Sequence, residues 1–262
     1  MSAKPRTGPP LTPAIAIISG GLGDIGRAIV RELAQRGADI AVGDVVPASR
    51  AAALLAEIRG LGRRGRYDRV DVSDAAAVAH WVRVVEQSLG TPTWIIPNAA
   101  IVTTASLRHI GPAEWRRELA INLDGAFHLA QAAALRLVRR KRPGRIVLIG
   151  SWAGEVAHAG IPSYCVSKAG LRMLGKLLAR EFAADDILVN EVAPGYVDAG
   201  LSGKLFERNP RLRVRARRRV PTHKLIQPAE VARQVAHLCD PANQQMTGSV
   251  LLMDGGLSLL TL

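Results

Sequence analysis

The sequence predicts an α/β fold, in which one doubly wound parallel sheet of about seven strands is flanked by helices on both faces. Short apolar runs alternate with longer helical patterns along the chain, which is a repeated βαβ rhythm. The short runs are rich in Ile, Val and Leu and alternate little with polar residues. Strands buried on both faces of a parallel sheet have this composition.

The predicted elements follow one another in a regular order. Gly37 stands where the first long helix should end, and Pro228 stands at the first-turn position of the last one, which are the positions these residues favour. Strands are expected at residues 14–19, 40–44, 67–72, 93–98, 145–151, 187–194 and 249–254, and helices include 24–36, 163–184 and 228–239.

The chain is strongly basic, with 35 Lys and Arg against 22 Asp and Glu and a formal net charge of +13. A positive field concentrates polyanions, so nucleic acid is a candidate partner. Arginines gather at residues 136–145 and 208–219, yet no nucleic-acid motif or interleaved aromatic accompanies them. A solvated helix end explains the first cluster more simply. We therefore do not expect nucleic acid as a partner.

A glycine-rich turn joins the first predicted strand to the first helix. Gly20, Gly21, Gly23 and Gly26 lie in this turn, which has the context that gives such glycines a meaning. Without Cβ atoms the backbone turns tightly, and a pyrophosphate can approach the unpaired N–H groups of the helix start. The turn predicts a dinucleotide site, although a plain strand-to-helix turn would have the same glycines.

Asp44 ends the second predicted strand, where a carboxylate can accept hydrogen bonds from both adenosine ribose hydroxyls. The same charge would repel a 2′-phosphate. Val45 and Val46 follow, and we see no Arg beside the site to hold such a phosphate. The cofactor is therefore predicted to be NAD.

Tyr164 and Lys168 lie four residues apart in a helical pattern, so their side chains project from one face. A nearby ammonium is expected to stabilise the phenolate and lower the pKa of the tyrosine towards the working range. Ser151 ends a strand thirteen residues earlier, where its hydroxyl can hydrogen-bond the reacting oxygen. The three residues predict exchange of a proton with an alcohol or carbonyl group.

Together these motifs resemble the single-domain, NAD-preferring branch of the short-chain dehydrogenase/reductase family, over roughly residues 14–257. Residues 19–26 resemble the TGxxxGxG turn of the family, and residues 97–100 its NNAG strand end. Asp71 and Val72 resemble the adenine-contacting pair, Asn122 the helix asparagine, residues 194–197 the segment covering the nicotinamide, and residues 253–256 the C-terminal strand and turn.

The resemblance implies roles for these residues. The catalytic set would be Asn122, which relays protons, Ser151, Tyr164 as general acid/base and Lys168. The cofactor would contact Gly20, Leu22, Gly23, Asp24, Ile25, Gly26, Asp44, Asp71, Val72, Asn98, Ala99, Ala100, Tyr164, Lys168, Pro194, Gly195 and Val197. Asp24, Pro97, Ala100 and Ala199 depart from the family pattern, and we expect Asp24 to point away from the pyrophosphate as a helix cap.

The activity expected is interconversion of a secondary alcohol and a ketone or aldehyde with NAD(H). Substrate contacts are predicted for Ser151, Trp152, Glu155, His158 and Tyr164, where Glu155 and His158 would suit a sugar, sugar acid or other polyhydroxylated molecule. A 3-oxoacyl thioester (carrier protein) reductase is the enzyme alternative, since the arginines of 208–219 could attract an anionic group. A nucleotide-sensing nucleic-acid-binding protein is the non-enzyme alternative.

Residues 1–13 are predicted to be a flexible N-terminal tail, and residues 14–262 one dinucleotide-binding catalytic domain with a substrate-side insertion at 199–221. We expect no metal, because Cys165 and Cys239 have no metal-ligand spacing. No apolar run approaches the roughly 20 residues of a membrane span, so we expect a cytoplasmic protein away from membranes. The resemblance implies a homotetramer.

Overall fold

The computed structural model describes residues 14–260, except for the side chains of residues 204, 205 and 208; the predicted tail at 1–13 lies outside the described residues. Seven strands form one sheet in the order β3-β2-β1-β4-β5-β6-β7, and every neighbouring pair is parallel. The strands are β1 Ile15–Ser19, β2 Asp39–Asp44, β3 Gly65–Arg69, β4 Trp94–Ile96, β5 Gly144–Ile149, β6 Ile187–Pro194 and β7 Val250–Met253. The predicted fold class is confirmed.

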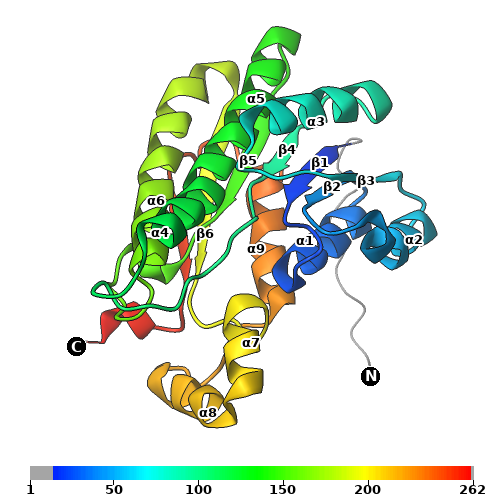
Figure 1. Cartoon of the computed structure of the whole chain (residues 1–262). Helices are drawn as coiled ribbons and strands as arrows, with labels where there is room; N and C mark the ends of the chain where they lie inside the picture. The colour runs from blue at the N-terminus through cyan, green and yellow to red at the C-terminus, as the bar shows by residue number, and fades with distance from the viewer. Residues whose placement is uncertain (1–13, 261–262) are drawn as a thin grey trace.

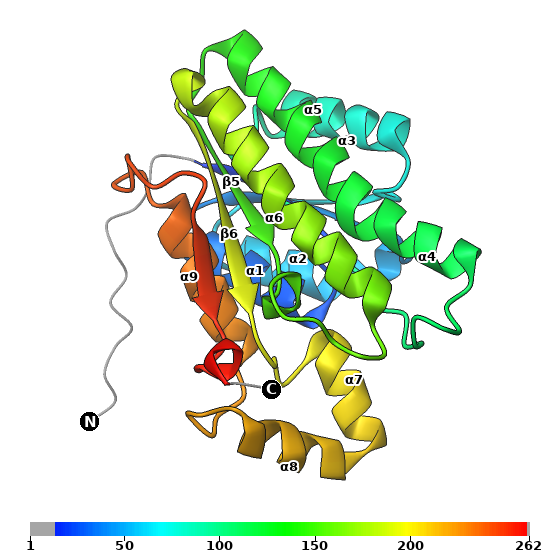
Figure 2. The same cartoon turned by 90° about the vertical axis from the view of Figure 1, so that its left-hand side faces the viewer.

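Helices cover both faces of this sheet (Figures 1 and 2). Helices α1 (Asp24–Gln35), α2 (Ala52–Gly60) and α9 (Pro228–Cys239) lie on one face, and α3 (Ala75–Ser88), α5 (Gly125–Arg140) and α6 (Pro162–Phe182) lie on the other. Helix α4 (Pro112–Leu119) continues into α5 through a π-helical turn at Ala120–Asp124.

Each strand of the centre feeds both hydrophobic cores, because successive side chains point to opposite faces. In β1, Ile18 packs into the core with α1 and α9, whereas Ile17 packs into the core with α3, α5 and α6. In β2, Val42 and Ala41 divide in the same way. All four side chains are fully buried, which explains why the strands read as continuous apolar runs.

Several strands end earlier than the sequence predicted. The strand expected at 67–72 is β3, which ends at Arg69, because its partner β2 ends at Asp44 and the ladder stops at that pair. The strand expected at 145–151 ends at Ile149, paired with Val192, and the chain then leaves the sheet through Gly150 and Ser151.

The predicted insertion at 199–221 forms two helices, α7 (Gly200–Arg208) and α8 (Pro210–Arg219), which project beyond the carboxyl edge of the sheet (Figure 1). Asp198 forms an ion pair with Arg213 of α8, and Ala216 and Val220 are buried. The other arginine cluster is largely the expected solvated helix end, with Arg139 and Arg140 exposed in the last turn of α5, whereas Arg145 lies in β5 and is buried. Among the described helices, none combines the length and apolarity that crossing a membrane requires.

Candidate active site

A cavity of about 1030 Å³ opens at the carboxyl ends of the central strands. The strand order reverses between β1 and β4, and open α/β sheets bind ligands at such a switch point. Its walls contain every predicted site residue except Asn122 and Glu155. The structure thus brings together side chains from the glycine-rich turn, the ends of β2, β4, β5 and β6, and helix α6.

The glycine-rich turn needs glycine for two separate reasons. Gly20 has φ +63°, and a Cβ there would lie 2.7 Å from Cα of Ala99. A Cβ on Gly26 would lie 2.3 Å from the carbonyl oxygen of Gly20. The turn is therefore packed tightly against the end of β4 and against its own helix.

Ser19 and Asn98 hold the turn in place. The hydroxyl of Ser19 accepts hydrogen bonds from the backbone N–H groups of Asn98 (3.1 Å) and Ala99 (3.2 Å). The amide nitrogen of Asn98 donates to the carbonyls of Ser19 (3.0 Å) and Gly20 (2.9 Å). Asn98 thus connects the ends of β1 and β4 and also lines the cavity.

The start of α1 forms a cradle suited to a pyrophosphate. Its N-cap residue is Gly23, which has no side chain to satisfy the first N–H groups of the helix. Gly23, Ile25 and Gly26 line the cavity at this point. Unpaired N–H groups and the helix dipole favour an anion here, so the residues present fit a dinucleotide.

Asp44 lines the predicted adenosine end of the cavity. Its carboxylate accepts hydrogen bonds from the backbone N–H groups of Leu22 (3.1 Å) and Val45 (2.8 Å). The expectation that no Arg lies beside this site was wrong, because Arg27 and Arg50 also line the cavity. Arg27 reaches it one turn into α1, whereas Arg50 comes from the segment after β2, so neither is adjacent to Asp44 in sequence. The guanidinium of Arg27 donates to the carbonyls of Leu22 and Arg50.

Asp24 does not cap its helix, contrary to expectation. It is the first residue of α1 rather than the N-cap, and its carboxylate accepts a hydrogen bond from the backbone N–H of Gly200 (2.8 Å). Gly200 begins α7, far away in sequence. The Asp24 carboxylate therefore bonds to the N–H group of a residue distant in sequence instead of one in its own helix.

The remaining predicted cofactor residues also lie along the cavity. The carboxylate of Asp71 accepts hydrogen bonds from the N–H and hydroxyl of Ser73, which fixes the turn after β3. At the other end, Gly195 donates from its N–H to the carbonyl of Met253 (2.8 Å), and a Cβ there would approach Asp254 to 2.9 Å. Val72, Ala100, Pro194 and Val197 complete this lining.

Tyr164 and Lys168 face each other from successive turns of α6. The Nζ of Lys168 lies 5.5 Å from the centre of the Tyr164 ring and donates to the carbonyl of Ile149 (2.7 Å). Ser151 follows the end of β5, and its Oγ accepts a hydrogen bond from Ala153 N–H, which leaves the hydroxyl hydrogen available. All three side chains line the same cavity.

Removal from water governs the charge states of this pair. It raises the pKa of Tyr164 to about 12, while the hydroxyl of Ser151 acts in the opposite direction. It lowers the pKa of Lys168 to about 8. The expected lowering of the Tyr164 pKa was thus wrong for this structure, because desolvation of the phenolate outweighs the hydrogen bond from Ser151. At neutral pH the pair is a phenol beside an ammonium.

Asn122 lies in the π-helical turn between α4 and α5, one layer behind the cavity wall. Its side-chain oxygen accepts from Ile101 N–H (2.9 Å), and its nitrogen donates to the Ile101 carbonyl (2.9 Å) and Ser167 Oγ (3.2 Å). Single π-turns are frequent at functional sites. The Asn122 side chain therefore joins the segment after β4 to the helix that carries Tyr164.

Aromatic side chains also line this cavity. The ring of Trp152 packs edge-on against His158, at 4.2 Å between centroids, and against Tyr196, at 5.4 Å. Nε2 of His158 is buried and has no hydrogen-bond partner among the described residues. Burial lowers the pKa of His158, with Arg219 acting in the same direction. Glu155 lies outside the cavity and pairs instead with Arg172 (3.1 Å).

Sequence reasoning missed two buried carboxylates near the cavity. Glu118 is completely buried and accepts from Thr103 N–H (3.0 Å) and Ser163 Oγ (2.6 Å). Glu191 of β6 is buried against Arg172 of α6. A charged residue inside an apolar strand pattern, as Glu191 is in 187–194, was the available signal.

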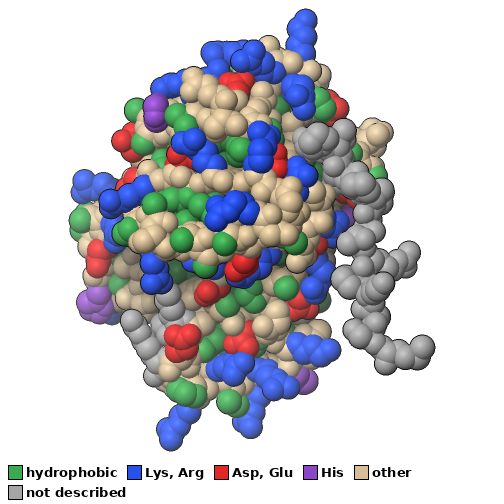
Figure 3. Space-filling model, turned by 90° about the vertical axis from the view of Figure 1, so that its right-hand side faces the viewer, with side chains coloured by type: hydrophobic (Ala, Val, Ile, Leu, Met, Phe, Trp, Pro, Cys, Tyr) green, Lys and Arg blue, Asp and Glu red, His purple; other side chains and the backbone are tan. Residues whose placement is uncertain are grey.

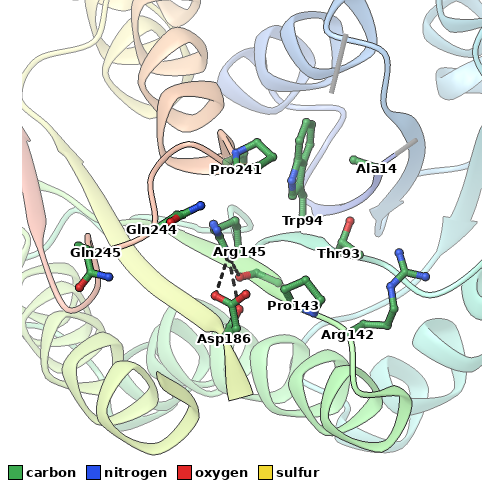
Figure 4. Close-up of a pocket in the computed structure, with 12 residues that line it drawn as sticks. Ala14, Thr93, Trp94, Arg142, Pro143, Arg145, Asp186, Pro241, Gln244 and Gln245 are labelled. Carbon is green, nitrogen blue, oxygen red and sulfur yellow. Dashed lines mark hydrogen bonds and ion pairs between the residues drawn. The ribbon is translucent and has the colours of Figure 1, made fainter. Parts of the chain in front are cut away.

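A second cavity of about 560 Å³ lies at the opposite, amino-terminal edge of the sheet (Figure 4). Arg145 reaches into it from β5 and forms a long ion pair with Asp186, at 3.8 Å. Its lining offers no hydroxyl beside a base that resembles the Tyr164 and Lys168 pair. Among the described residues no cluster of His, Cys, Asp and Glu fits a metal ion.

Basic side chains are dispersed over the face shown in Figure 3, with acidic side chains among them. Ion pairs account for several arginines, including Arg31 with Glu57 and Arg136 and Arg140 with Glu86. This face carries no continuous basic stripe of the kind that follows a nucleic-acid backbone.

Comparisons with known proteins agree with this geometry. A family model described as enoyl-(acyl carrier protein) reductase matches residues 21–258. The cis-4-hydroxycyclohexanecarboxylate dehydrogenase of Sinomonas cyclohexanicum is 35% identical over 92% of this chain and 95% of its own. The 3-oxoacyl-[acyl-carrier-protein] reductase FabG of Pseudomonas aeruginosa is 32% identical over 93% and 96%. A gluconate 5-dehydrogenase of Burkholderia cenocepacia, solved in complex with NADP and tartrate, superposes with a TM-score of 0.90 at 29% identity, covering 96% of this chain and 97% of that one.

Proposed function

Because the chain belongs to the short-chain dehydrogenase/reductase family, we propose that it interconverts a secondary alcohol and a ketone or aldehyde with NAD(H), on a sugar, sugar acid or other polyhydroxylated small molecule. The observation that carries this proposal is the placement of Tyr164 and Lys168, which face each other in a cavity that also holds Ser151 and the uncapped start of α1.

The charge states suggest how the residues divide the work. With a pKa of about 12, Tyr164 is a proton donor at neutral pH, suited to protonating a carbonyl oxygen as it is reduced. The Lys168 ammonium stabilises the phenolate that this leaves, and the Ser151 hydroxyl donates to the reacting oxygen. A bound nicotinamide would supply or accept the hydride. In the oxidation direction the same groups would act in reverse, with Tyr164 as the base.

NAD is the proposed cofactor on account of Asp44. Its carboxylate lies at the end of β2 in the cavity, where it would accept from ribose hydroxyls and repel a 2′-phosphate. Arg50 is the opposing feature, because it lines the same cavity and a guanidinium suits a phosphate.

The two residues make opposite predictions for cofactor choice. Asp44→Ala should reduce the preference for NAD over NADP by at least about tenfold in kcat/KM, since one carboxylate hydrogen bond and one repulsion are lost. Arg50→Gln should leave NAD turnover unchanged. If the unaltered protein prefers NADP and Arg50→Gln abolishes that preference, NAD is the wrong assignment.

A hydroxylated substrate is supported by His158, which packs against Trp152 and whose buried Nε2 has no hydrogen-bond partner within residues 14–260. A neutral imidazole both donates and accepts, which suits a hydroxyl group. Sugars, polyols, hydroxy acids and 3-oxoacyl thioesters should be compared with both cofactors, following the absorbance of the reduced nicotinamide. Turnover of polyols or sugar acids, with none of the thioesters, is the expected result.

Reduction of 3-oxoacyl thioesters is the second candidate, favoured by the FabG relatives at 32% identity. Faster turnover of thioesters than of any sugar or polyol would replace the first proposal with this one. Salt-dependent retention on DNA with no turnover of any alcohol or ketone would favour a nucleic-acid-binding protein instead.

We also propose a homotetramer that uses α5, α6 and the β7 edge. Large apolar side chains are exposed on the two long helices, namely Phe127 and Leu135 on α5 and Val166, Met173 and Leu177 on α6. Such a patch on a monomer marks an interaction surface. Light scattering after size-exclusion chromatography should give four times the chain mass, and Met173→Glu with Leu177→Glu should reduce it.

A further inference from the structure

An ion pair between the partly buried Arg172 and the buried Glu191 lies beside Ser151. Arg172 follows Lys168 by one turn of α6, and its guanidinium donates to both carboxylate oxygens of Glu191, at 3.2 and 3.3 Å. Glu191 is only 2% exposed in the middle of β6. An unpaired charge is costly to bury, so removal of either partner would leave an uncompensated charge at this position.

The pair contacts the end of β5, from which Ser151 emerges. Arg172 donates a hydrogen bond to the carbonyl of Ser151 (3.3 Å). The carboxylate of Glu191 lies over Gly150, where a Cβ would come within 1.9 Å of its oxygen. Lys168 donates to the carbonyl of Ile149 (2.7 Å). Charged side chains therefore bond the carbonyls of Ile149 and Ser151, and the Glu191 carboxylate packs on Gly150 between them.

The charged and titratable groups around the Lys168 ammonium come from few elements. The carboxylates of Glu191 in β6 and Glu118 in α4 act on it electrostatically, Tyr164 of its own helix places its ring 5.5 Å away, and β5 contributes the carbonyl of Ile149. The carboxylates of Glu191 and, to a lesser extent, Glu118 raise the pKa of Lys168 against the larger effect of burial. Glu191 is thus the leading counter-charge to burial.

We infer that Arg172 and Glu191 are positioning residues that fix the Gly150 and Ser151 backbone and hold the charge of the Lys168 ammonium. This inference rests on the proposed function, because the ammonium matters only if Tyr164 exchanges a proton. Glu191 supplies the negative charge, and Arg172 orients Glu191 while attaching it to Ser151.

The pH profile of carbonyl reduction tests this arrangement. Reduction requires the ammonium, so the rate of the unaltered protein should fall as the pH rises through about 8, where Lys168 loses its proton. Glu191→Gln keeps the shape but removes the charge and leaves Arg172 with only its exposed partner Glu155. The fall should then move about 1 pH unit lower.

Substitutions of Arg172, the partner of Glu191, should shift the pH profile in the opposite direction, and a substitution of Glu155 provides a control. Arg172→Met leaves the Glu191 carboxylate without its cation, and the fall should move to higher pH. Arg172→Lys keeps the charge and loses the forked contact, so the fall should stay in place while kcat drops. Glu155→Gln removes the exposed partner of the same Arg172, and its profile should match that of the unaltered protein.

The inference is supported if the pH at which the rate falls moves down in Glu191→Gln and up in Arg172→Met. A purely structural defect would not move this pH in opposite directions in the two variants. Equal profiles in Glu191→Gln and Glu155→Gln would overturn it. Titration of the Lys168 Nζ by ¹⁵N NMR, assigned by its loss in Lys168→Met, measures the same shift without turnover. If Lys168 titrates as expected while no alcohol or ketone is turned over, the proposed function fails and the electrostatic coupling stands.

Discussion

The main cavity has two halves, which we propose to bind the dinucleotide and the substrate, and the two halves are built in different ways. The dinucleotide half is made of backbone and short local motifs, in which Gly20, Gly23 and Gly26 lie within seven residues of one another. The substrate half is assembled from Trp152 and His158 after β5, Tyr196 after β6, and the first turn of α7. A local motif can be read directly from the sequence, whereas a wall assembled from distant loops cannot.

The reason lies in what each half must recognise. A pyrophosphate requires only free backbone N–H groups that it can approach closely, and a strand-glycine-helix turn supplies these. Shape and hydrogen bonding to one particular substrate depend on how separate loops pack, as when Trp152 holds His158 at 4.2 Å. Variants in the two halves should therefore have separable effects, and the reacting residues between them should affect every substrate.

The largest effect is expected from Tyr164→Phe, which removes the hydroxyl that lies between the two halves. The rate should fall by about 10³-fold or more, because proton transfer by a positioned group contributes about 10²–10⁴-fold. Steady-state kinetics with both cofactors would show the loss. Tyr67→Phe is the control, because it removes the hydroxyl of a tyrosine that does not line the cavity. Its turnover should stay within a few-fold of that of the unaltered protein. Full activity of Tyr164→Phe would end the proposed mechanism.

A large effect confined to the dinucleotide half is expected from Gly20→Ala. Its φ of +63° and the 2.7 Å approach to Ala99 should together lower the free energy of unfolding by at least about 2 kcal/mol and weaken NAD binding. Gly62→Ala is the matched control, since Gly62 has φ +70° with no atom within 4 Å of an added Cβ. Its cost should be about 1 kcal/mol, measured by chemical denaturation. Equal costs would mean that the contact with Ala99 is unimportant.

The smallest effect is expected from His158→Leu in the substrate half. Loss of one hydrogen bond should raise KM for the preferred hydroxylated substrate by about tenfold, with KM for the cofactor unchanged. Glu155→Gln, on the same loop but outside the cavity, should leave both values unchanged. A parallel rise in both KM values for His158→Leu would contradict the division into two halves.

Particular elements show where sequence reasoning succeeds and where it stops. The runs at 187–194 and 228–239 gave β6 and α9 with their full bounds, because strong apolar patterns end there at clear breaks. Strand β3 was displaced, since an edge strand takes its limits from its single neighbour. Asp24, Arg27 and Arg50 were misjudged because Gly200, Leu22 and the folded loop after β2 decide where these side chains go.

Local sequence patterns were enough to predict the doubly wound sheet, the glycine-rich turn and the pairing of Tyr164 with Lys168. These follow from the period of strands and helices and from one helical turn, which are properties of neighbouring residues. Three-dimensional packing sets the charge states of the pair and the contacts around it, including Glu118 and the Arg172 to Glu191 ion pair. Burial and Coulomb interactions depend on which distant segments exclude water around a group, and no local pattern records that.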